Sequence, residues 1–118
     1  FEFFNMGRLI KKEKIDVVHA HWVLPQGFLA YLCKKLFKVP YVVTAHAGDV
    51  FPLKSSFFRF FSFLAVENSD FCTANSSYTK KELEKISMKK SISIIPMGVD
   101  LQLFTKKNKN HNIHFVHK

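Results

Sequence analysis

Four short apolar runs, separated by helix-length segments, limit what this chain can fold into. They are rich in β-branched and aromatic residues and occupy residues 15–22, 41–46, 70–76 and 92–95. Short runs of this composition that alternate with longer segments are typical of βαβ units, in which the strands form a parallel sheet. The sequence therefore predicts an α/β fold with a parallel sheet and flanking helices.

Polar and ring-bearing residues gather at the carboxyl ends of the first two runs, where a parallel sheet binds its ligands. His19 and His21 are two residues apart on a strand, so their side chains point to the same face. His46 follows the next run, one βαβ step further along, so we expect its strand to lie beside that of His21. The candidate site residues of this cluster are His19, His21, Trp22, Thr44, His46, Gly48 and Asp49.

Three interpretations of this cluster are open. The two histidines of the first run, with His46 and Asp49, could bind a divalent metal ion, as His-x-His strands do in some hydrolases. Alternatively, the histidines satisfy hydrogen bonds at strand ends, which suits His19 if a helix buries it. In the third interpretation, His21 and His46 line a pocket for a polar ligand, Gly48 lets the backbone approach that ligand, and Asp49 accepts bonds from its hydroxyl groups. We favour the third interpretation for His46.

Several helix boundaries can also be predicted. Residues 1–14 have the pattern of a helix tail that leads into the first strand. The helix after that strand should begin at Pro25 and end before Pro40. A capping box at Thr79–Glu82 predicts the start of the helix after the third run. The apolar face of the helix after Pro25 is expected to consist of Leu29, Leu32, Cys33 and Leu36.

The helix expected at residues 54–67 is unusually aromatic. Its apolar residues cover an arc much wider than the stripe of an ordinary surface helix, with the cationic Arg59 among them. We expect this helix to be buried between the sheet and a neighbouring element, because core-facing stripes are the commoner case. The alternative is a surface that meets lipid or an apolar acceptor. The residues of the arc are Phe57, Phe58, Phe60, Phe61, Phe63 and Leu64.

The net charge of +9 favours an anionic partner. Nucleic acid is not expected, because the lysines form scattered pairs without a nucleic-acid-binding motif, whereas an anionic membrane surface is retained as a candidate partner. No apolar run approaches the ~18 residues that span a bilayer and no signal peptide is recognisable, so we expect a cytoplasmic protein, peripheral on the inner face of the membrane if it binds lipid. Cys33 and Cys72 lack metal-binding spacing and are expected to be buried free thiols.

Three segments of the chain resemble motifs of the family-4 retaining glycosyltransferases. Residues 16–22, followed by 24–27, are similar to the family's second-strand segment. Residues 42–49 are similar to its Thr-x-His-Gly-x-Asp stretch, and residues 95–100, with Phe104, to its Ile-Pro-Asn-Gly-Val-Asp element before the hinge. The order and the intervals of the motifs also agree, so the resemblance covers nearly the whole chain.

The resemblance implies a GT-B fold, in which two Rossmann-like domains face each other across a cleft. Residues 1–100 would form a partial N-terminal, acceptor-side domain, residues 101–112 an interdomain linker, and residues 113–118 the truncated start of the C-terminal, donor-binding domain. The implied reaction moves a sugar from a nucleotide-sugar donor to an acceptor hydroxyl, with retention of configuration and without a catalytic metal or other cofactor. The acceptor would be a glycan or a lipid-linked sugar in cell-surface glycan synthesis.

The resemblance also assigns roles to single residues. His46 matches the family's catalytic cleft histidine, and its expected contribution is a positioned hydrogen bond to a sugar hydroxyl. His21 and Trp22 would lie near the acceptor. The other substrate-binding residues would be Thr44, Gly48 and Asp49, and the hinge and cleft residues would be Pro96, Gly98 and Asp100.

The chain also departs from the family pattern. It shows neither the first strand with its Gly-Gly loop nor the C-terminal domain with its basic pair and Glu-x7-Glu pattern, and Ala47, Met97 and His117 replace Gly, Asn and Gly. We therefore expect this chain alone to transfer no sugar and to need the missing C-terminal domain of the same protein. The alternatives from other classes are a non-catalytic half-domain that binds a glycan or lipid headgroup, and a His-x-His metal-dependent hydrolase.

Overall fold

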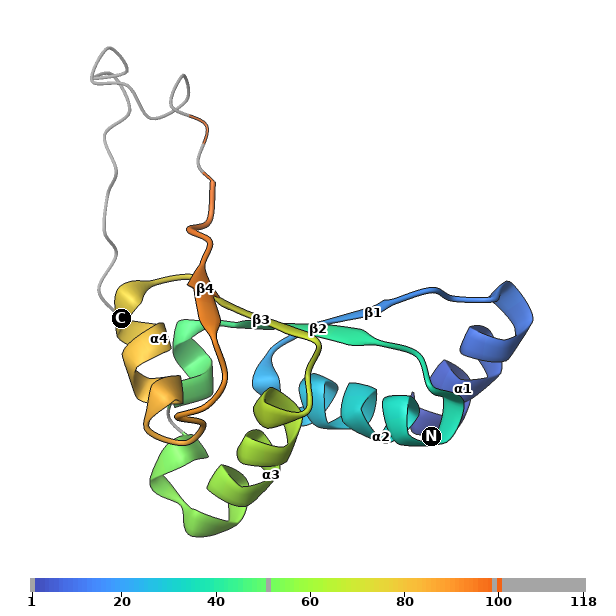
Figure 1. Cartoon of the computed structure of the whole chain (residues 1–118), viewed down its shortest axis with the longest axis horizontal. Coiled ribbons are helices and arrows are strands. Elements are labelled where there is room, and N and C mark those ends of the chain that lie inside the picture. Colours follow the sequence, from blue (N-terminus) through green and yellow to red (C-terminus); the bar gives the residue numbers. More distant parts are fainter. Residues whose placement is uncertain (1, 51, 99, 101–118) are drawn as a thin grey trace, which may run out of the picture.

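The fold alternates helices and strands along the chain, as the apolar runs predict (Figure 1). A computed structural model describes residues 2–50, 52–98 and 100; the expected linker at 101–112 and the expected domain start at 113–118 lie outside the described residues. None of the described helices has the length and apolar character of a membrane-spanning segment. The elements are α1 (Glu2–Glu13), β1 (Val18–His21), the π-helical turn η1 (Val23–Gly27), α2 (Phe28–Phe37), β2 (Tyr41–Ala45), the 3-10 turns η2 (Ala47–Val50) and η3 (Pro52–Lys54), α3 (Ser56–Glu67), β3 (Phe71–Ala74), α4 (Ser77–Glu84) and β4 (Ile92–Ile94).

The four strands form one parallel sheet in the order β1-β2-β3-β4. Because every strand runs in the same direction, the carboxyl ends of neighbouring strands meet at the same edge of the sheet. The register pairs His21 with Thr44, and Thr44 with Thr73. The structure thus confirms the expected α/β fold, a Rossmann-like parallel sheet with flanking helices.

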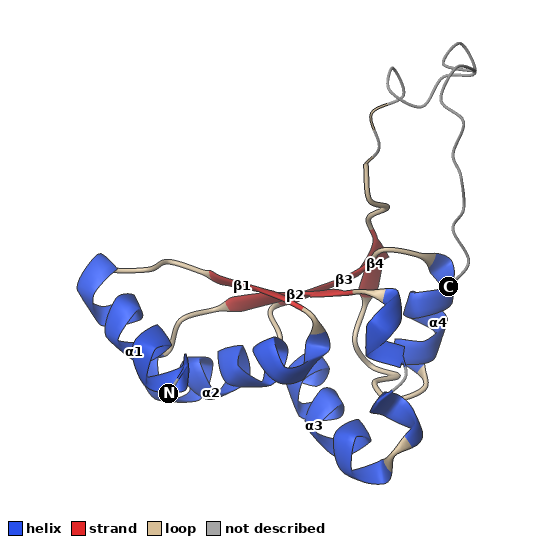
Figure 2. Ribbon diagram, turned by 180° about the vertical axis from the view of Figure 1, so that it is seen from behind, coloured by secondary structure: helices blue, strands red, loops and turns tan. Residues whose placement is uncertain are grey.

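All four described α-helices lie on one side of the sheet, and the opposite face is open (Figures 1 and 2). Burial along β2 follows this arrangement: Tyr41, Val43 and Ala45 are buried, whereas the residues between them are only partly covered. The hydroxyl of Tyr41 donates a hydrogen bond to the carbonyl of Ala65 at 2.7 Å and so joins β2 to α3. The core therefore fills a single layer between the sheet and the helices.

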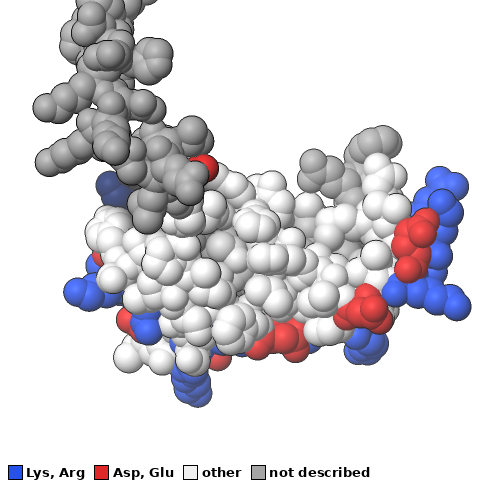
Figure 3. Space-filling view, turned by 90° about the horizontal axis from the view of Figure 1, so that it is seen from above, with Lys and Arg blue, Asp and Glu red and all other residues white. Residues whose placement is uncertain are grey.

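The open face of the sheet is largely apolar. Phe71, Ile95 and Met97 are exposed there and line the same hollow. Figure 3 looks onto this face and shows no charged side chain over its visible middle, whereas charges gather at the rim. Contiguous apolar surface of this kind favours association with another surface.

Both cysteines are buried free thiols, as expected. Cys33 lies in α2 and Cys72 in β3, and both belong to the core. Burial raises the pKa of both thiols, and it raises that of Cys72 to about 11. The thiols therefore carry a proton at neutral pH and are poor nucleophiles.

The start of α2 differs from the prediction. Pro25 lies within η1, and the helix begins only at Phe28. The inward face differs as well, because Ala30 and Cys33 are buried whereas Leu36 is exposed. The expected apolar face is therefore wrong at Leu36, because small side chains let the helix lie close to the sheet.

The cap of α4 also differs from the prediction. The chain enters the helix directly after β3, and the hydroxyl oxygen of Ser76 accepts the N–H of Thr79 at 3.2 Å. Thr79 is buried in the first turn, where its hydroxyl donates to the side-chain oxygen of Asn75 at 3.0 Å. The expected capping box at Thr79–Glu82 is therefore wrong, because the N-cap is Ser76, three residues before Thr79.

The aromatic helix α3 is not buried in the way expected. It packs against α2 and η1 with small residues, so that Ser62, Ala65 and Val66 are buried. Most of its phenylalanine rings are exposed, because a close approach to its neighbours leaves no room for them on the inner side. The expectation of burial is therefore wrong for Phe57, Phe58, Phe60 and Phe63.

Asp70 ties α2 to the sheet at the start of β3. Its Oδ1 accepts a hydrogen bond from Lys34 Nζ at 2.7 Å, and its Oδ2 accepts the N–H of Tyr41 at 2.8 Å. Partial burial acts to raise the pKa of this carboxyl, but the bonds from Lys34 and Tyr41 together outweigh it and lower the pKa. The ionised form is therefore the one that the folded chain stabilises.

We expect Asp70→Asn to lower the free energy of unfolding by about 1 kcal/mol at neutral pH, a modest effect because the ion pair is partly exposed. Since the folded pKa lies below the unfolded value of 3.8, the stabilisation is present above that value and is lost as the pH falls through the folded pKa. Urea unfolding at neutral pH and in acid measures the difference. The exposed Asp16, changed to Asn, is the matched control, and an equal loss there would contradict the prediction.

Candidate functional site

The carboxyl ends of β1 and β2 bring the histidines of the sequence cluster together. β1 ends at His21 and β2 at Ala45, and the register places His21 beside Thr44. His46 therefore leaves the sheet next to His21, and the expectation that their strands are neighbours is confirmed. His19 and His21 also lie on the same face, with ring centroids 4.4 Å apart.

Three rings form the centre of the candidate site. His21 Nδ1 lies 3.3 Å from His46 Nε2, so one imidazole donates its N–H and the other accepts. The two rings are nearly parallel, at 26° with centroids 5.6 Å apart, and the Trp22 ring lies 5.3 Å from that of His46. Among the described residues, the second ring nitrogen of His46, Nδ1, has no hydrogen-bond partner, which leaves it able to bond a ligand.

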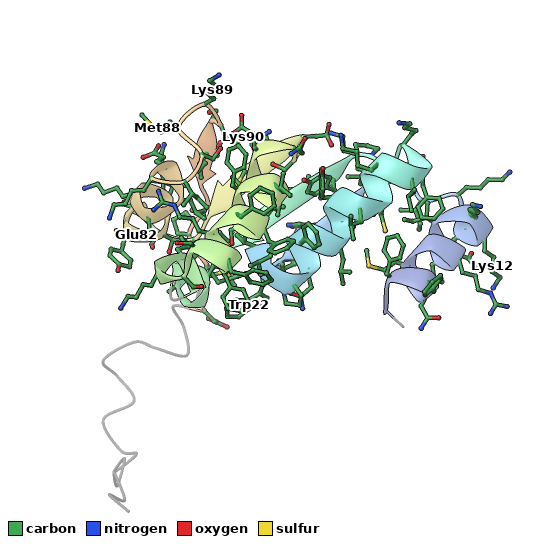
Figure 4. All side chains as sticks on the ribbon, turned by 90° about the horizontal axis from the view of Figure 1, so that it is seen from below. Lys12, Trp22, Glu82, Met88, Lys89 and Lys90 are labelled. Atoms are coloured by element: carbon green, nitrogen blue, oxygen red, sulfur yellow. The ribbon has the colours of Figure 1, made fainter. Side chains whose placement is uncertain are left out.

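The backbone of Trp22 directs its ring toward His46. Trp22 adopts a left-handed conformation with φ of 82°, which is uncommon for a residue with a bulky side chain. Its N–H still donates to the carbonyl of Thr44 at 3.0 Å, and its own carbonyl accepts the N–H of Gly27 at 3.1 Å. The strand therefore ends at a fixed turn, next to the start of α2 (Figure 4).

Asp49 fixes the loop after β2 to the turn after β1. Its side chain is only 4% exposed; Oδ1 accepts the N–H of Val23 at 2.9 Å, and Oδ2 accepts the N–H of His46 at 2.8 Å. Burial raises the pKa of this carboxyl, although the backbone bonds act in the opposite direction. The carboxylate thus holds the His46 backbone, and a direct bond from Asp49 to a ligand hydroxyl stays a prediction.

Gly48 lies against the Trp22 ring. A Cβ at this position would come within 2.5 Å of Trp22 Cζ3 and 2.9 Å of Cη2. The absence of a side chain therefore lets the indole rest on the loop. The predicted approach of a ligand to the Gly48 backbone stays a prediction.

We expect Gly48→Ala to displace the Trp22 ring at a cost below about 1 kcal/mol, because the partly exposed indole can move outward. Trp22 is the only tryptophan of the chain, so its emission maximum reports the displacement directly. The matched control is Gly98→Ala, because no atom lies within 4 Å of a Cβ there. An unchanged emission spectrum in Gly48→Ala would contradict the contact.

A chain of hydrogen bonds crosses the open face of the sheet. His19 Nε2 lies 2.8 Å from Thr44 Oγ1, which in turn lies 2.8 Å from Thr73 Oγ1. Burial and the neighbouring His21 lower the pKa of His19. His19 is exposed on this face, so the expectation that a helix buries it is wrong, although its side chain does make a local hydrogen bond. Thr73 was not among the site residues expected from the sequence. It lies two residues after Phe71 on the same strand, so strand alternation places both on the open face and could have indicated it.

A hollow of about 330 Å³ extends over this open face. His21 and Thr44 line it, together with Pro96 and Gly98 from the segment after β4. The fold therefore brings two of the predicted hinge residues to the same surface as the first histidines, and Asp100 follows as an exposed residue. The residues on the loop side of the site, which do not line this hollow, are Trp22, His46, Gly48 and Asp49.

Metal ligation was one interpretation of the histidines. Within residues 2–50, 52–98 and 100, no group of three or more His, Cys, Asp or Glu side chains is placed to hold a metal ion. The carboxylate that the sequence offers nearest to His46, that of Asp49, already accepts two backbone hydrogen bonds.

A parallel α/β sheet with polar residues at the carboxyl ends of adjacent strands is the architecture of Rossmann-like ligand-binding proteins. The model of Glycosyltransferase Family 4 matches residues 1–103. The chain belongs to this family.

Three relatives are similar to this chain. An uncharacterized glycosyltransferase of Methanocaldococcus jannaschii is 33% identical over 102 residues, which are 85% of this chain and 29% of the relative. The N-acetyl-alpha-D-glucosaminyl L-malate synthase of Bacillus anthracis is 28% identical over 112 residues, 88% of this chain and 28% of the relative. A Bacillus subtilis protein named for a glycosyltransferase of teichuronic acid biosynthesis is 34% identical over 92 residues, 75% of this chain and 23% of the relative. The chain spans less than a third of the length of each.

Proposed function

We propose that this chain is the acceptor-side part of a retaining hexosyltransferase of the GT-B type. Family membership and the names of the relatives support sugar transfer. The observation that carries the proposal is the cluster of His46, His21 and Trp22 at the carboxyl ends of adjacent strands. Its imidazoles and indole offer the hydrogen bonds and the flat apolar surface that a sugar requires.

In the proposed reaction, an acceptor hydroxyl oxygen bonds to the anomeric carbon of a nucleotide-sugar. The bond from that carbon to the phosphate oxygen breaks, and the hydroxyl proton passes to the departing nucleoside diphosphate. The Nδ1 atom of His46 would hydrogen-bond a hydroxyl of the transferred sugar and keep the reacting atoms in line. His21 and Trp22 would contact the acceptor, with Thr44 and Gly48 beside them. No metal or other cofactor enters this scheme.

The proposed division of the chain follows the family's two-domain arrangement. Residues 1–100 would bind the acceptor, residues 101–112 would connect the domains, and residues 113–118 would begin the domain that binds the donor. Pro96, Gly98 and the neighbouring Asp100 would then form the hinge side of the cleft. The length of the relatives supports a further domain, since each is more than three times as long as the matched segment.

We further propose that the enzyme works in the cytoplasm, peripheral on the inner face of the membrane, on glycans or lipid-linked sugars destined for the cell surface. The relative named for teichuronic acid biosynthesis supports a cell-surface product. The relative named as a malate synthase supports a small acceptor instead. The acceptor panel of an assay should therefore include both classes.

The proposal is tested by expressing the complete reading frame that contains this chain and supplying it with nucleotide-hexoses and both classes of acceptor. We expect a glycoside whose anomeric configuration, measured by NMR coupling, is that of the donor sugar. The 118-residue chain alone is expected to give no product. Binding of a glycan without any transfer by the complete protein would instead favour a non-catalytic binding half-domain, and inverted configuration would overturn the retaining assignment.

A further inference from the structure

The first half of α3 presents large aromatic residues to the outside. Phe57, Phe58, Phe60 and Phe63 are 66%, 48%, 57% and 38% exposed, whereas Ser62 in the same helix is buried. A surface helix ordinarily buries such rings and exposes its serines. The described residues therefore leave an apolar surface on α3 uncovered. We call Phe57, Phe58, Phe60 and Phe63 the phenylalanine face.

The rings of this face are held in place by one another. Phe57 contacts both Phe58 and Phe61 edge-on, with centroids 5.5 and 4.9 Å apart, and Phe60 contacts Phe61 at 5.5 Å. Phe61 is partly buried and packs on Phe28 of α2 at 4.9 Å. Phe57, Phe58 and Phe60 are thus connected to one another and to the core through Phe61. The helix that carries them lies on the covered side of the sheet, with the other helices (Figure 1).

Cationic residues border the phenylalanine face. Lys54, Arg59 and Lys85 line one hollow at its edge, where the Arg59 guanidinium donates to the carbonyl of Lys85 at 2.8 Å. Glu82 also lines this hollow, but it pairs with Lys85 at 2.5 Å. Among the described residues, Lys54 and Arg59 have no ion pair, and α3 carries no carboxylate before Glu67 at its end. The border therefore keeps a positive charge.

We propose that the phenylalanine face, with Lys54 and Arg59, binds the surface of an anionic lipid bilayer. Aromatic rings favour the boundary between headgroups and acyl chains, and lysine and arginine attract anionic headgroups. A helix with exposed rings and a cationic border fits a position parallel to that boundary. This inference rests on the proposed location at the membrane and gives it a site; it does not depend on sugar transfer, since none of these residues belongs to the histidine cluster.

The charge at the border separates a bilayer from a second copy of the chain. Two copies joined face to face through the phenylalanine face would bring two sets of unpaired cations together, which like-charge repulsion opposes. An anionic bilayer supplies the missing countercharge over the whole border. The net charge of +9 adds a longer-range attraction to the same surface.

Co-sedimentation with vesicles tests the proposal on the complete protein that contains this chain. The probes are vesicles of phosphatidylcholine alone and of equimolar phosphatidylcholine and phosphatidylglycerol. We expect at least about tenfold tighter binding to the anionic vesicles, which added salt weakens. Equal binding to both vesicle types, or binding to neither, would overturn the proposal.

Paired variants assign the binding to α3. The double variant F57S/F60S is expected to bind anionic vesicles at least about tenfold more weakly, because each exposed ring loses its apolar contact with lipid. The matched control is F4S/L9S, which removes two large apolar side chains that are exposed on α1. Both variants should retain the far-ultraviolet circular dichroism of the parent. An equal loss in the control variant would overturn the assignment.

Charge variants test the border in the same way. Lys54→Glu should weaken binding to the anionic vesicles about tenfold, whereas Lys12→Glu, at the distant α1 (Figure 4), should change it less than about threefold. Sedimentation velocity separates the alternative occupant. If F57S/F60S converts a dimer to a monomer and leaves vesicle binding intact, the face joins two copies and the proposal fails.

Discussion

Replacing His46 with alanine in the complete enzyme is expected to lower kcat for sugar transfer about 100-fold, with a much smaller change in KM. A hydrogen-bond donor directed at the charge that develops in the transition state typically changes kcat by about this factor. An interaction that strengthens only in the transition state lowers kcat and kcat/KM together, whereas a uniform contact raises KM alone. Steady-state kinetics with the best donor and acceptor from the panel measure both parameters.

The proposed role of His46 is supported by the contacts that hold its ring in place. Its backbone N–H is held by Asp49 at 2.8 Å, its Nε2 lies 3.3 Å from His21, and its ring rests beside Trp22. Three contacts thus fix the imidazole, so that little reorganisation is required when a sugar binds. The ring is only partly buried, and Nδ1 is left for the ligand.

Two further variants give this prediction its control. His46→Gln retains an amide that can hydrogen-bond a hydroxyl, so we expect it to recover part of the lost kcat. His19→Ala removes an imidazole of the neighbouring strand β1, which bonds Thr44 and not His46, and it should lower kcat much less. If His19→Ala and His46→Ala lose activity equally, the effect belongs to the sheet edge as a whole and the role of His46 is refuted.

The position of the candidate site could be predicted because it depends on strand periodicity. The two-residue spacing of His19 and His21 places them on one face, and one βαβ step places His46 beside them. Both relations are local or follow from the shortest connection between parallel strands. The fold class follows from the same alternation of short apolar runs and longer segments.

The inner faces of α2 and α3 could not be predicted in this way. In both helices apolar residues occupy several sides, so their spacing does not single out the side that meets the sheet. Close packing decided instead: Ala30 and Cys33 in α2, and Ala65 in α3, let the helices approach, while Leu36 and the phenylalanine face remained outside. The largest apolar side chains of a helix are therefore a poor guide where small ones compete for the inner side.

The role of Asp49 could not be predicted because its partners are backbone groups distant in the sequence. The N–H of Val23 lies 26 residues away, and no pattern in the chain marks it. The sequence shows an acidic residue near a histidine, which is the pattern of a ligand-binding carboxylate. Only the fold reveals that both oxygens already accept bonds from Val23 and His46.

We expect Asp49→Ala to lower the free energy of unfolding by about 2–4 kcal/mol, because the buried N–H of Val23 loses an acceptor worth about 1–3 kcal/mol and the N–H of the partly exposed His46 loses one worth about 1 kcal/mol. Val23 is almost fully buried, so water cannot replace the carboxylate there. Asp49→Asn should lose less, since its amide oxygen still accepts from one N–H group while its amide nitrogen opposes the other. Urea unfolding of the three proteins at neutral pH measures both differences.

The free energy of unfolding that Asp49→Ala loses should depend on pH in the opposite direction to that lost by Asp70→Asn. The folded pKa of Asp49 is raised, by burial first, so the folded chain binds its proton more tightly than the unfolded chain. The difference in free energy of unfolding between the parent and Asp49→Ala therefore falls as the pH rises from the unfolded pKa of 3.8 through the folded pKa. Above the folded pKa the difference is constant. The difference between the parent and Asp70→Asn instead rises with pH, from the folded pKa of Asp70 up to the unfolded value, because the folded pKa of this residue is lowered. If the two variants show the same direction, burial does not dominate the pKa of Asp49, and the carboxylate is less buried than described.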